Sequence, residues 1–573
     1  MHHPHRWMRV RFLLGLVFLV SIGWMAAEAR KPRLVLFISV DQARFDYLVR
    51  FRPLFKDGLK LILDRGVHFT NTFHDYAVTE TGPGHATLAT GSFPAKTGII
   101  SNEWFDRARR RVVNCVEDPA SPIVTSKGTS TAASSSGRSP RHLLLSGLAD
   151  WIRRADPQSK VFAASRKDRG AILLGGGQAH GAFWYDDKTG EFVTSEYYYR
   201  TYPEWIRAFT RDHSPALRFG KLWTPLPVSE EARKTAGIEI VNCASTFPHP
   251  IGGLTFTPDA AYFLAFGATP YMDEYLSEFA QQLVAQEKLG QDDHLDFLGL
   301  SFSAVDSVGH TYGPNSPEAL DTFLRLDQIL GALLRYLDQQ VGLDRMVISF
   351  SADHGVMELP EYLKMKNLPG SRISMEDVVC LEGLGAKLEE KFGKDNWLLE
   401  DLYFNYETLA KRNLSREQVE RELSGRLARC PSVSRVWTRT ELLNPPPNRD
   451  PFLVRYLHSF NPERSPDLLI QYREHVLPHF GPGTGHGSPY DYDRHIPFVL
   501  IVPGRPAKVV EQEIWSVDIA PTVASILGIN PDRKLDGVDR STLLVTAPLP
   551  HTSFVTGVAS QNPPPGGLFR ARP

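Results

Sequence analysis

A series of short, almost wholly apolar runs constrains this chain more than any other feature of its sequence. Three of the runs are closely followed by an aspartate. The runs are Leu34–Val40 before Asp41, Phe297–Val305 before Asp306, Met346–Phe350 before Asp353, Leu468–Tyr472 and Ile496–Val502. Such runs are typical of strands buried on both faces, as in a parallel sheet covered by helices. The predicted fold class is therefore α/β, with a mostly parallel central sheet sandwiched by helices and with inserted cap segments.

The stretches between these runs predict the helices and the location of the chemistry. In Pro317–Tyr336, apolar residues recur at spacings of three and four, which is typical of an amphipathic helix packed on a sheet. Open α/β sheets place their chemistry just beyond the carboxyl ends of the strands. The polar residues that follow the apolar runs are therefore the candidate functional residues.

The length of 573 residues allows two to four domains, or one large α/β domain with insertions, at about 100–200 residues per domain. A Ser-rich stretch at 121–141 predicts a flexible loop, and a charged stretch at 375–431 predicts a small helical cap. The predicted organisation is a signal peptide at 1–29, the first part of the core at 30–360, a cap region at 361–465, the final part of the core at 466–547 and a Pro-rich tail at 548–573.

The N-terminus has the three parts of a secretory signal peptide. Arg6, Arg9 and Arg11 precede the apolar run Phe12–Ala27, and an Ala-Glu-Ala sequence ends at Ala29. The run is shorter than the ~20 residues that span a bilayer, so a retained anchor is the less favoured alternative. We expect cleavage after Ala29 and a periplasmic or secreted protein without a stable membrane span.

Charge and cysteine content exclude several other classes of protein. Lysine and arginine total 64 against 65 acidic residues, so bulk charge does not predict nucleic acid as a structural partner. Four cysteines in so long a chain rule out a disulfide scaffold, although one or two bridges are possible. Their spacing leaves the pairing open, and the absence of a CxxC motif argues against a zinc knuckle.

Three aspartates and three histidines follow or lie near the predicted strand ends. Mixed sets of this kind suit Zn²⁺, with manganese, iron or cobalt as less favoured occupants. Six ligands divide naturally into two three-ligand sites, and two ions ~3.5–4 Å apart can clamp the oxygens of a phosphoryl displacement. Any one motif alone is better explained as a helix cap. The six candidate ligands are Asp41, Asp306, His310, Asp353, His354 and His486.

A hydroxyl followed by Gly-Pro-Gly and an apolar helix start occurs at Thr81. This pattern places a side chain and free main-chain N–H groups at a helix N-terminus, which favours anions. A hydroxyl beside a divalent ion ionises more easily and becomes a nucleophile. Simple N-capping by Thr81 is the alternative.

The order of these motifs resembles that of the alkaline phosphatase superfamily. The motifs are Asp41, T-E-T-G-P-G-H-A-T-L-A-T-G from Thr79, D-S-V-G-H from Asp306, A-D-H-G from Ala352 and G-T-G-H-G from Gly483. Within it, the chain is similar to the threonine-nucleophile branch shared by PafA-type alkaline phosphatases and nucleotide pyrophosphatase/phosphodiesterases. The resemblance runs from Leu34 to about Leu544.

The resemblance implies two zinc ions and a phosphothreonine intermediate on Thr81. One zinc would be held by Asp306, His310 and His486, and the other by Asp41, Asp353 and His354, with Thr81 also bound to metal through its hydroxyl oxygen. Asn102 matches an asparagine that hydrogen-bonds a phosphoryl oxygen. Lys167 and Arg169 match a Lys-Asp-Arg segment that contacts the transferred group, and together they can compensate the extra charge of a phosphate monoester.

Other polar residues near these motifs are interpreted as structural. His74 and His85 are left out of the ligand set, and Asp46 and Glu80 are predicted to be local hydrogen-bonding partners. Asp518 is predicted to cap a helix. A sulfatase is not expected, because the segment at Thr81 lacks both the Cys or Ser nucleophile and the Arg of sulfatases.

The predicted function is that of an exported two-zinc alkaline phosphatase acting on small phosphate monoesters. One alternative is a nucleotide pyrophosphatase/phosphodiesterase that uses the same ions. Another is a non-catalytic envelope protein that binds phosphate or glycan. The natural substrate, the oligomeric state and the metal identity do not follow from the sequence.

Overall fold

The computed structural model of the chain describes residues 31–129, 137–238 and 247–544. The predicted signal peptide at 1–29 and the tail at 548–573 lie outside these residues. Among the described helices, none is both long enough and apolar enough to span a bilayer.

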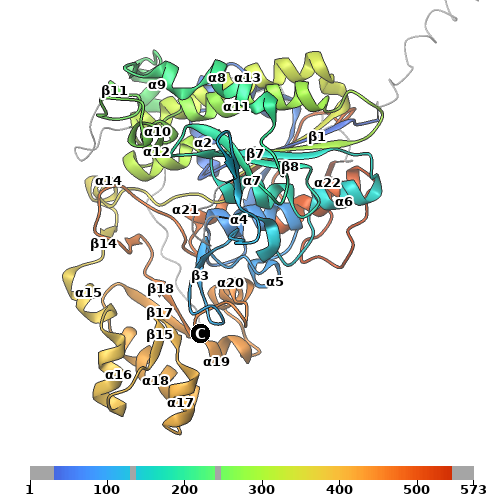
Figure 1. Cartoon of the computed structure of the whole chain (residues 1–573). Coiled ribbons are helices and arrows are strands. Elements are labelled where there is room, and N and C mark those ends of the chain that lie inside the picture. The colour runs from blue at the N-terminus through green and yellow to red at the C-terminus, as the bar shows by residue number, and fades with distance from the viewer. Residues whose placement is uncertain (1–30, 130–136, 239–246, 545–573) are drawn as a thin grey trace, which may run out of the picture.

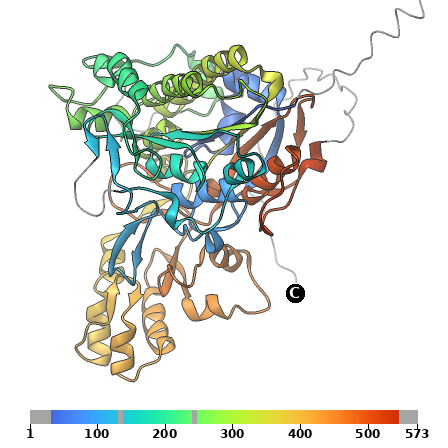
Figure 2. The same ribbon diagram turned by 45° about the vertical axis from the view of Figure 1, so that its right-hand side comes forward.

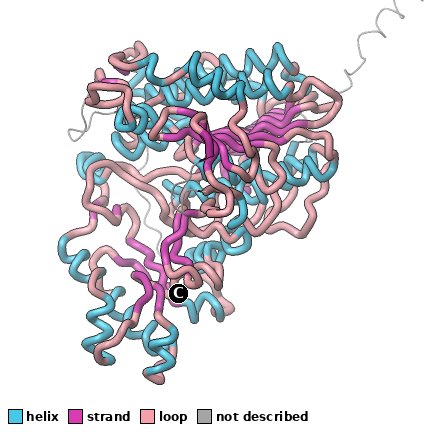
Figure 3. The backbone as a smooth tube through the Cα atoms, in the orientation of Figure 1, coloured by secondary structure: helices cyan, strands magenta, loops and turns pink. Residues whose placement is uncertain are grey.

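A large mixed sheet forms the centre of the molecule (Figure 3). Its strands lie in the order β21-β2-β20-β13-β1-β12-β7-β8-β9-β5-β6, and β22 also pairs with β2. In this spatial order the bounds are Lys508–Val510, Val67–Phe73, His495–Ile501, Met346–Ser351, Leu34–Val40, Asp296–Phe302, Val161–Ser165, Gly181–Asp186, Glu191–Ser195, Ile123–Thr125 and Gly128–Thr129, with β22 at Ile514–Trp515.

The middle of the sheet is parallel, as the apolar runs predict. Strand β1 pairs in parallel with β12 on one side and β13 on the other, and all seven of its residues are buried. Strand β20 runs antiparallel to β13 and β2, and β8 to β9. The predicted strand 297–305 is too long: β12 ends at Phe302, and a helix begins at Ala304. The α/β fold class is confirmed.

Helices cover both faces of the sheet (Figure 1). On one face lie α3, α8, α11 and α13, and on the other α4, α6, α7 and α22. The predicted helix at 317–336 is confirmed and continues to Gln340. The bounds of the core helices are α2 Phe45–Arg50, α3 Gly58–Arg65, α4 Thr81–Thr90, α5 Pro94–Thr97, α6 Leu148–Ala155, α7 Asp168–Gly175, α8 Glu204–His213, α9 Glu230–Thr235, α10 Ala260–Gly267, α11 Tyr271–Glu287, α12 Ala304–Tyr312, α13 Pro317–Gln340, α14 Pro360–Met365, α21 Asp491–Arg494 and α22 Ile519–Ile526.

Residues 375–472 form a second lobe, coloured yellow to orange, that lies below the core in both ribbon views (Figures 1 and 2). It has its own apolar cluster around Trp397, Leu423 and Leu468. The predicted place of 468–472 in the central sheet is wrong, because among the described residues this strand pairs with β17 alone, in the second lobe. The elements of the lobe are α15 Met375–Leu381, α16 Leu384–Phe392, β15 Leu398–Glu400, β16 Tyr403–Phe404, α17 Tyr406–Lys411, α18 Arg416–Leu427, β17 Val433–Thr438, α19 Arg439–Leu443, α20 Pro451–Ser459 and β18 Leu468–Tyr472.

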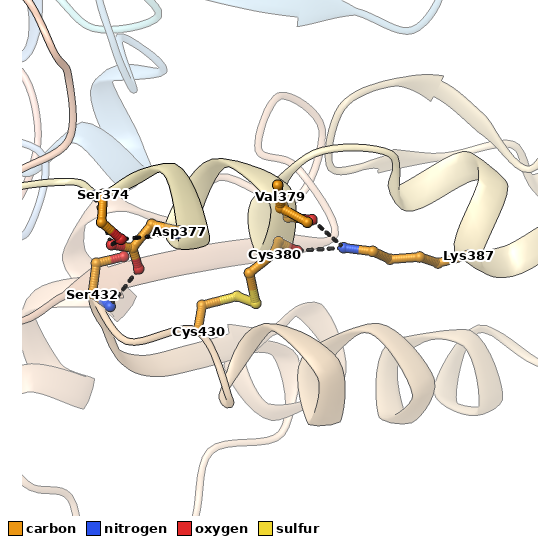
Figure 4. Close-up of a disulfide and its surroundings, with 7 residues drawn as sticks. All are labelled: Ser374, Asp377, Val379, Cys380, Lys387, Cys430 and Ser432. Atoms are coloured by element: carbon orange, nitrogen blue, oxygen red, sulfur yellow. Dashed lines mark hydrogen bonds between the residues drawn. A yellow bond between two sulfur atoms is a disulfide. The ribbon is translucent and has the colours of Figure 1, made fainter.

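A disulfide between Cys380 and Cys430 joins α15 to the segment between α18 and β17 in the second lobe (Figure 4). Cys115 is a buried free thiol in the core, and Cys243 lies outside the described residues. The structure therefore resolves a pairing that the sequence left open.

Short hairpins and bridges complete the described structure. The Ser-rich stretch at 121–141 is not only a loop, because β5 and β6 lie within it and β5 joins the edge of the central sheet. The remaining strands are β3 Glu103–Asp106, β4 Arg111–Asn114, β10 Leu222–Trp223, β11 His249–Pro250, β14 Ser371–Arg372 and β19 Val476–Leu477.

Candidate active site

Three adjacent parallel strands deliver three carboxylates to one edge of the sheet. Asp41 follows β1 directly, and Asp353 is the second residue after β13. Asp306 lies in the first turn of α12, which follows β12. Because β1 lies between β12 and β13, these side chains converge at the carboxyl ends of the strands. All three are buried.

Each of the three predicted histidine ligands is hydrogen-bonded through Nδ1 to a main-chain oxygen. The Nδ1 atoms of His310, His354 and His486 lie 2.8, 2.9 and 2.8 Å from the main-chain oxygens of Thr484, Gly355 and Thr79. A carbonyl oxygen can only accept a hydrogen bond, so each Nδ1 carries a proton, and in the neutral imidazole Nε2 keeps a free electron pair. Metal-binding histidines are oriented by such outer hydrogen bonds.

The free imidazole nitrogens point at the carboxylates. The Nε2 atom of His310 lies 3.2 Å from Asp306 Oδ1, and that of His486 lies 3.7 Å from the same oxygen. The Nε2 atom of His354 lies 3.3 Å from Asp353 Oδ2. The rings of His354 and His486 stack with their centroids 3.6 Å apart.

This arrangement fits divalent cations. Within the described part of the chain, neither Asp353 Oδ2 nor His354 Nε2 has a hydrogen-bond partner, although both atoms are buried. Burial and the nearby His310 outweigh the opposing groups and lower the pKa of His486 to about 3, and burial likewise lowers the pKa of His354. Neutral imidazoles beside carboxylates are the donors that Zn²⁺ prefers.

The donor atoms gather in two clusters that differ from the division implied by the resemblance. One cluster holds Asp306, His354 and His486, and the other holds Asp41, His85 and Asp353. His85 lies in the second cluster, although the sequence analysis set it aside. Both of its ring nitrogens are within hydrogen-bond distance of other groups, Nδ1 of Thr81 O at 2.9 Å and Nε2 of Ser301 Oγ at 3.0 Å. His85 also lies between the two carboxylates, with Nε2 3.5 Å from Asp41 Oδ1 and Nδ1 3.4 Å from Asp353 Oδ2.

Thr81 is the first residue of α4, as the Gly-Pro-Gly pattern predicts. The helix start passes very close to the strand-end loop: a Cβ atom at Gly84 would lie 2.3 Å from the main-chain oxygen of Asp353. Only glycine allows this approach. The close approach sets helix α4, which carries the candidate nucleophile, against one of the candidate metal ligands.

Lys167 connects the candidate nucleophile to the carboxylates. Its Nζ lies 2.7 Å from Asp306 Oδ2, 2.9 Å from Asp41 Oδ2 and 3.3 Å from Thr81 Oγ1. Burial opposes the charged form of Lys167, but the two aspartates outweigh it and raise its pKa. The ammonium group therefore places a fixed positive charge beside the Thr81 hydroxyl.

Asn102 and Arg169 occupy different positions relative to Thr81. Asn102 Oδ1 accepts the main-chain N–H of Gly82 at 2.7 Å, directly beside the candidate nucleophile. Arg169 lies in the first turn of α7, next to Lys167, and its nearest carboxylate is that of Asp168 at 3.7 Å. Its buried Nε has no hydrogen-bond partner among the described residues.

A cavity of about 230 Å³ is lined in part by the loop that carries His486. Its wall is formed by Glu80, by residues of this loop and by the β18 and β19 segments of the chain. Four tyrosines contribute to the lining: Tyr456, Tyr472, Tyr490 and Tyr492. The second lobe and the candidate site thus share a boundary.

Sequence and structural comparisons agree on one family. Residues 35–489 match the family described as type I phosphodiesterase / nucleotide pyrophosphatase. The chain is 33% identical to alkaline phosphatase PhoV of Synechococcus elongatus over 517 residues, which cover 87% of this chain and 90% of PhoV. It is also 33% identical to alkaline phosphatase PafA of Elizabethkingia meningoseptica over 545 residues, 92% of this chain and 96% of PafA. The crystal structure of wild-type PafA matches with a TM-score of 0.81 at 30% identity, covering 90% of this chain and 99% of that one.

The chain belongs to this family, among its PafA-type alkaline phosphatases. The resemblance identified from the motifs is thus confirmed. The match extends over almost the whole of both chains.

The remaining polar residues that were interpreted as structural have local partners in this PafA-type chain. Asp46 pairs with Arg44 and Arg50, as expected. Asp518 stands at the N-cap position of α22, but the predicted capping bond is absent. Its carboxylate instead accepts the N–H groups of Trp515, in β22, and of Val538, and so it links this strand to the segment at Val538.

Proposed function

We propose that this chain is an exported alkaline phosphatase that hydrolyses small phosphate monoesters through a phosphothreonine intermediate on Thr81. The observation that carries the proposal is the Thr81 hydroxyl at a helix N-terminus, 3.3 Å from a lysine that also contacts two of the buried aspartates. The family supports it, because two relatives that match 87% and 92% of this chain are named alkaline phosphatases.

Two zinc ions are part of the proposal. Three of the residues, Asp306, His310 and His486, would hold one ion, and Asp41, Asp353 and His354 would hold the other. Bound zinc would supply positive charge that stabilises phosphoryl oxygens and favours ionised hydroxyl groups. The unpartnered buried atoms of Asp353 and His354 support a cation at this place.

The chain's own residues account for the covalent chemistry. Thr81 Oγ forms a bond to phosphorus as the bond to the ester oxygen breaks, and the departing alcohol takes up a proton in exchange for the one lost by Thr81. Water then attacks the phosphothreonine, which releases inorganic phosphate and restores the hydroxyl. Thr81 lies at the N-terminus of α4, where the helix dipole favours an anion, although the Gly82 N–H is already bound by Asn102.

Asn102, Lys167 and Arg169 would bind the oxygens of the transferred group. Phosphoryl transfer depends mainly on positioning and on charge stabilisation. A monoester dianion carries one more charge than a diester, and the Lys167 ammonium beside Thr81 is placed to compensate it. This location supports monoesters over diesters.

Metal analysis and turnover of an aryl phosphate test the mechanism. We expect two zinc ions per chain, and a loss of activity of several orders of magnitude in Thr81→Ala with both ions retained. Phosphate should label the wild type covalently on quenching but not the variant. Full activity of Thr81→Ala would contradict the mechanism.

The family description favours a second candidate, a phosphodiesterase or nucleotide pyrophosphatase. The comparison of a monoester with a diester in wild type and Lys167→Ala separates the two functions. We expect a preference for the monoester that falls in the variant. A diester preference that survives Lys167→Ala would favour the second candidate.

Export is supported by the Cys380–Cys430 disulfide, because such bonds persist in oxidising compartments. Fractionation of cells and N-terminal sequencing of the mature protein test this part. We expect the mature chain to begin at Arg30 and to be absent from the cytoplasm.

A further inference from the structure

We propose that Glu80 is a positioning residue that holds Asn102 so that the side-chain NH₂ of Asn102 faces the phosphoryl group. The inference rests on the proposed function. It concerns a carboxylate directly beside the candidate nucleophile, where a negative charge would be expected to disfavour an anionic substrate.

Glu80 occupies the N-cap position of α4 but does not cap it with its side chain. Its Oε2 instead accepts two hydrogen bonds from across the site, from Ser101 Oγ at 2.7 Å and from the main-chain N–H of Asn102 at 2.7 Å. Its negative charge is therefore directed at two donors of the neighbouring loop.

Asn102 is held at three points. Its N–H is bound by Glu80, its main-chain oxygen accepts the N–H of Cys115 at 2.9 Å, and its Oδ1 accepts the N–H of Gly82 at 2.7 Å. Because a main-chain N–H can only donate, the atom that faces Gly82 must be the amide oxygen. The NH₂ group is left without a partner among the described residues and is free to donate to a ligand.

The segment 79–82 is the point where the parts of the site meet. The main-chain oxygen of Thr79 holds His486, Glu80 holds Asn102, Thr81 carries the hydroxyl and Gly82 fixes the Asn102 amide. A shift of the Glu80 carboxylate would therefore move Asn102 relative to Thr81. Misplacement by about 1 Å can cost about a hundredfold in rate.

Two substitutions separate the effect of the length of the Glu80 side chain from the effect of its charge. Glu80→Gln keeps the length of the side chain, and its single amide oxygen can accept both hydrogen bonds as Oε2 does. Glu80→Asp keeps the charge but withdraws the carboxylate by one methylene, too far to bind Asn102. We expect kcat/KM for an aryl phosphate to stay within about threefold of wild type in Glu80→Gln and to fall about ten- to hundredfold in Glu80→Asp.

A double-mutant cycle with Asn102→Ala tests whether Glu80 acts on catalysis through Asn102. In the Asn102→Ala background, Glu80→Asp should cost less than about threefold, because the residue that it positions is gone. Ser101→Ala, which removes the other donor to Glu80, should retain wild-type kcat/KM. Metal content and Tm are measured for every variant.

Three results would overturn the proposal. They are an additive cycle, a Glu80→Gln variant as impaired as Glu80→Asp, and a loss in Glu80→Asp explained by lost metal. These results differ from a failure of the proposed function, which would appear in the wild type as absent monoester turnover or as an active Thr81→Ala variant.

Discussion

Gly84 is a residue at which helix α4 passes very close to the strand-end loop that carries Asp353. An added methyl group there would overlap the main chain of Asp353, which cannot rotate away as a side chain could. We expect Gly84→Ala to move the start of α4, to lower kcat by about a hundredfold and to destabilise the protein by about 1–3 kcal/mol. Steady-state kinetics and thermal unfolding measure the two effects.

Gly425 provides the matched control for Gly84. It lies in helix α18, and nothing lies within 4 Å of an added Cβ atom there. Gly425→Ala should leave kcat unchanged and raise stability by about 0.5–1 kcal/mol. Wild-type kcat in Gly84→Ala would show that the close approach does not position Thr81.

The residues of the site were predictable from sequence to different degrees. Five of the six candidate ligands could be found because carboxylates and imidazoles follow apolar runs, and His486 because it lies in a glycine-rich loop. The hydrogen-bond partners of the histidines could not, because Thr79, Gly355 and Thr484 contribute main-chain oxygens that carry no side-chain signal. His85 offered a signal that was not used, since it follows Thr81 by one helical turn in α4.

At the scale of elements, apolar runs predicted strands better than they predicted the partners of those strands. The run at 297–305 continues past the end of β12 because the first turn of α12 is itself buried and apolar. The run at 468–472 forms a strand, but burial against the second lobe's own cluster satisfies its apolar residues. Hydrophobicity alone does not tell which core buries a strand.

Two neighbouring interactions hold helix α15 to the rest of the second lobe (Figure 4). One is the disulfide of Cys380, and the other is Asp377. The Asp377 carboxylate accepts the N–H groups of Ser374 and Ser432 at 2.9 and 2.7 Å. Burial alone would raise the pKa of Asp377, but these donors and the Ser374 hydroxyl outweigh it and lower the pKa to about 2.

The lowered pKa of Asp377 predicts a pH-dependent contribution to stability. A carboxyl that ionises more readily in the folded state stabilises it above the unfolded pKa, about 4, and loses this effect as the pH falls towards 2. We expect Asp377→Asn to lower the free energy of unfolding by about 1–3 kcal/mol at pH 7 and 5. The difference from wild type should shrink at pH 3.

Urea unfolding followed by tryptophan fluorescence measures this difference at each pH. Glu376→Gln, at an exposed neighbouring position, is the control and should match wild type throughout. A difference between wild type and Asp377→Asn that is the same at pH 3 as at pH 7 would show that the ionised carboxylate is not the source of the stability.

At the scale of the whole molecule, the candidate ligands come from segments that are far apart in sequence but adjacent in the sheet. Asp41 follows β1, Asp306 and His310 lie on α12, Asp353 and His354 follow β13, and His486 lies on a later loop. The second lobe contributes none of the six. Bound ions would therefore cross-link the core at the carboxyl ends of its strands and leave the second lobe unlinked.

The distribution of the ligands predicts which part of the molecule loses stability when metal is removed. Without ions, burial and the charge of Asp41 raise the pKa of Asp353, which is the signature of carboxylates crowded together. Ions bound at a thousandfold above their Kd would each stabilise the folded chain by about 4 kcal/mol. Chelation should therefore abolish activity and lower Tm, and zinc should restore both.

Hydrogen exchange locates the effect of chelation. We expect faster exchange in β1, α12, β13 and the loop at 483–488, and unchanged exchange in α16 and α18, because only the former carry or adjoin ligands. Thr81→Ala, which keeps all six ligands, should respond to chelation as wild type does, so lost catalysis cannot mimic the result. An equal increase in hydrogen exchange in the core and in the second lobe would contradict a metal site confined to the strand ends. The second lobe has its own apolar cluster and contributes none of the six candidate ligands.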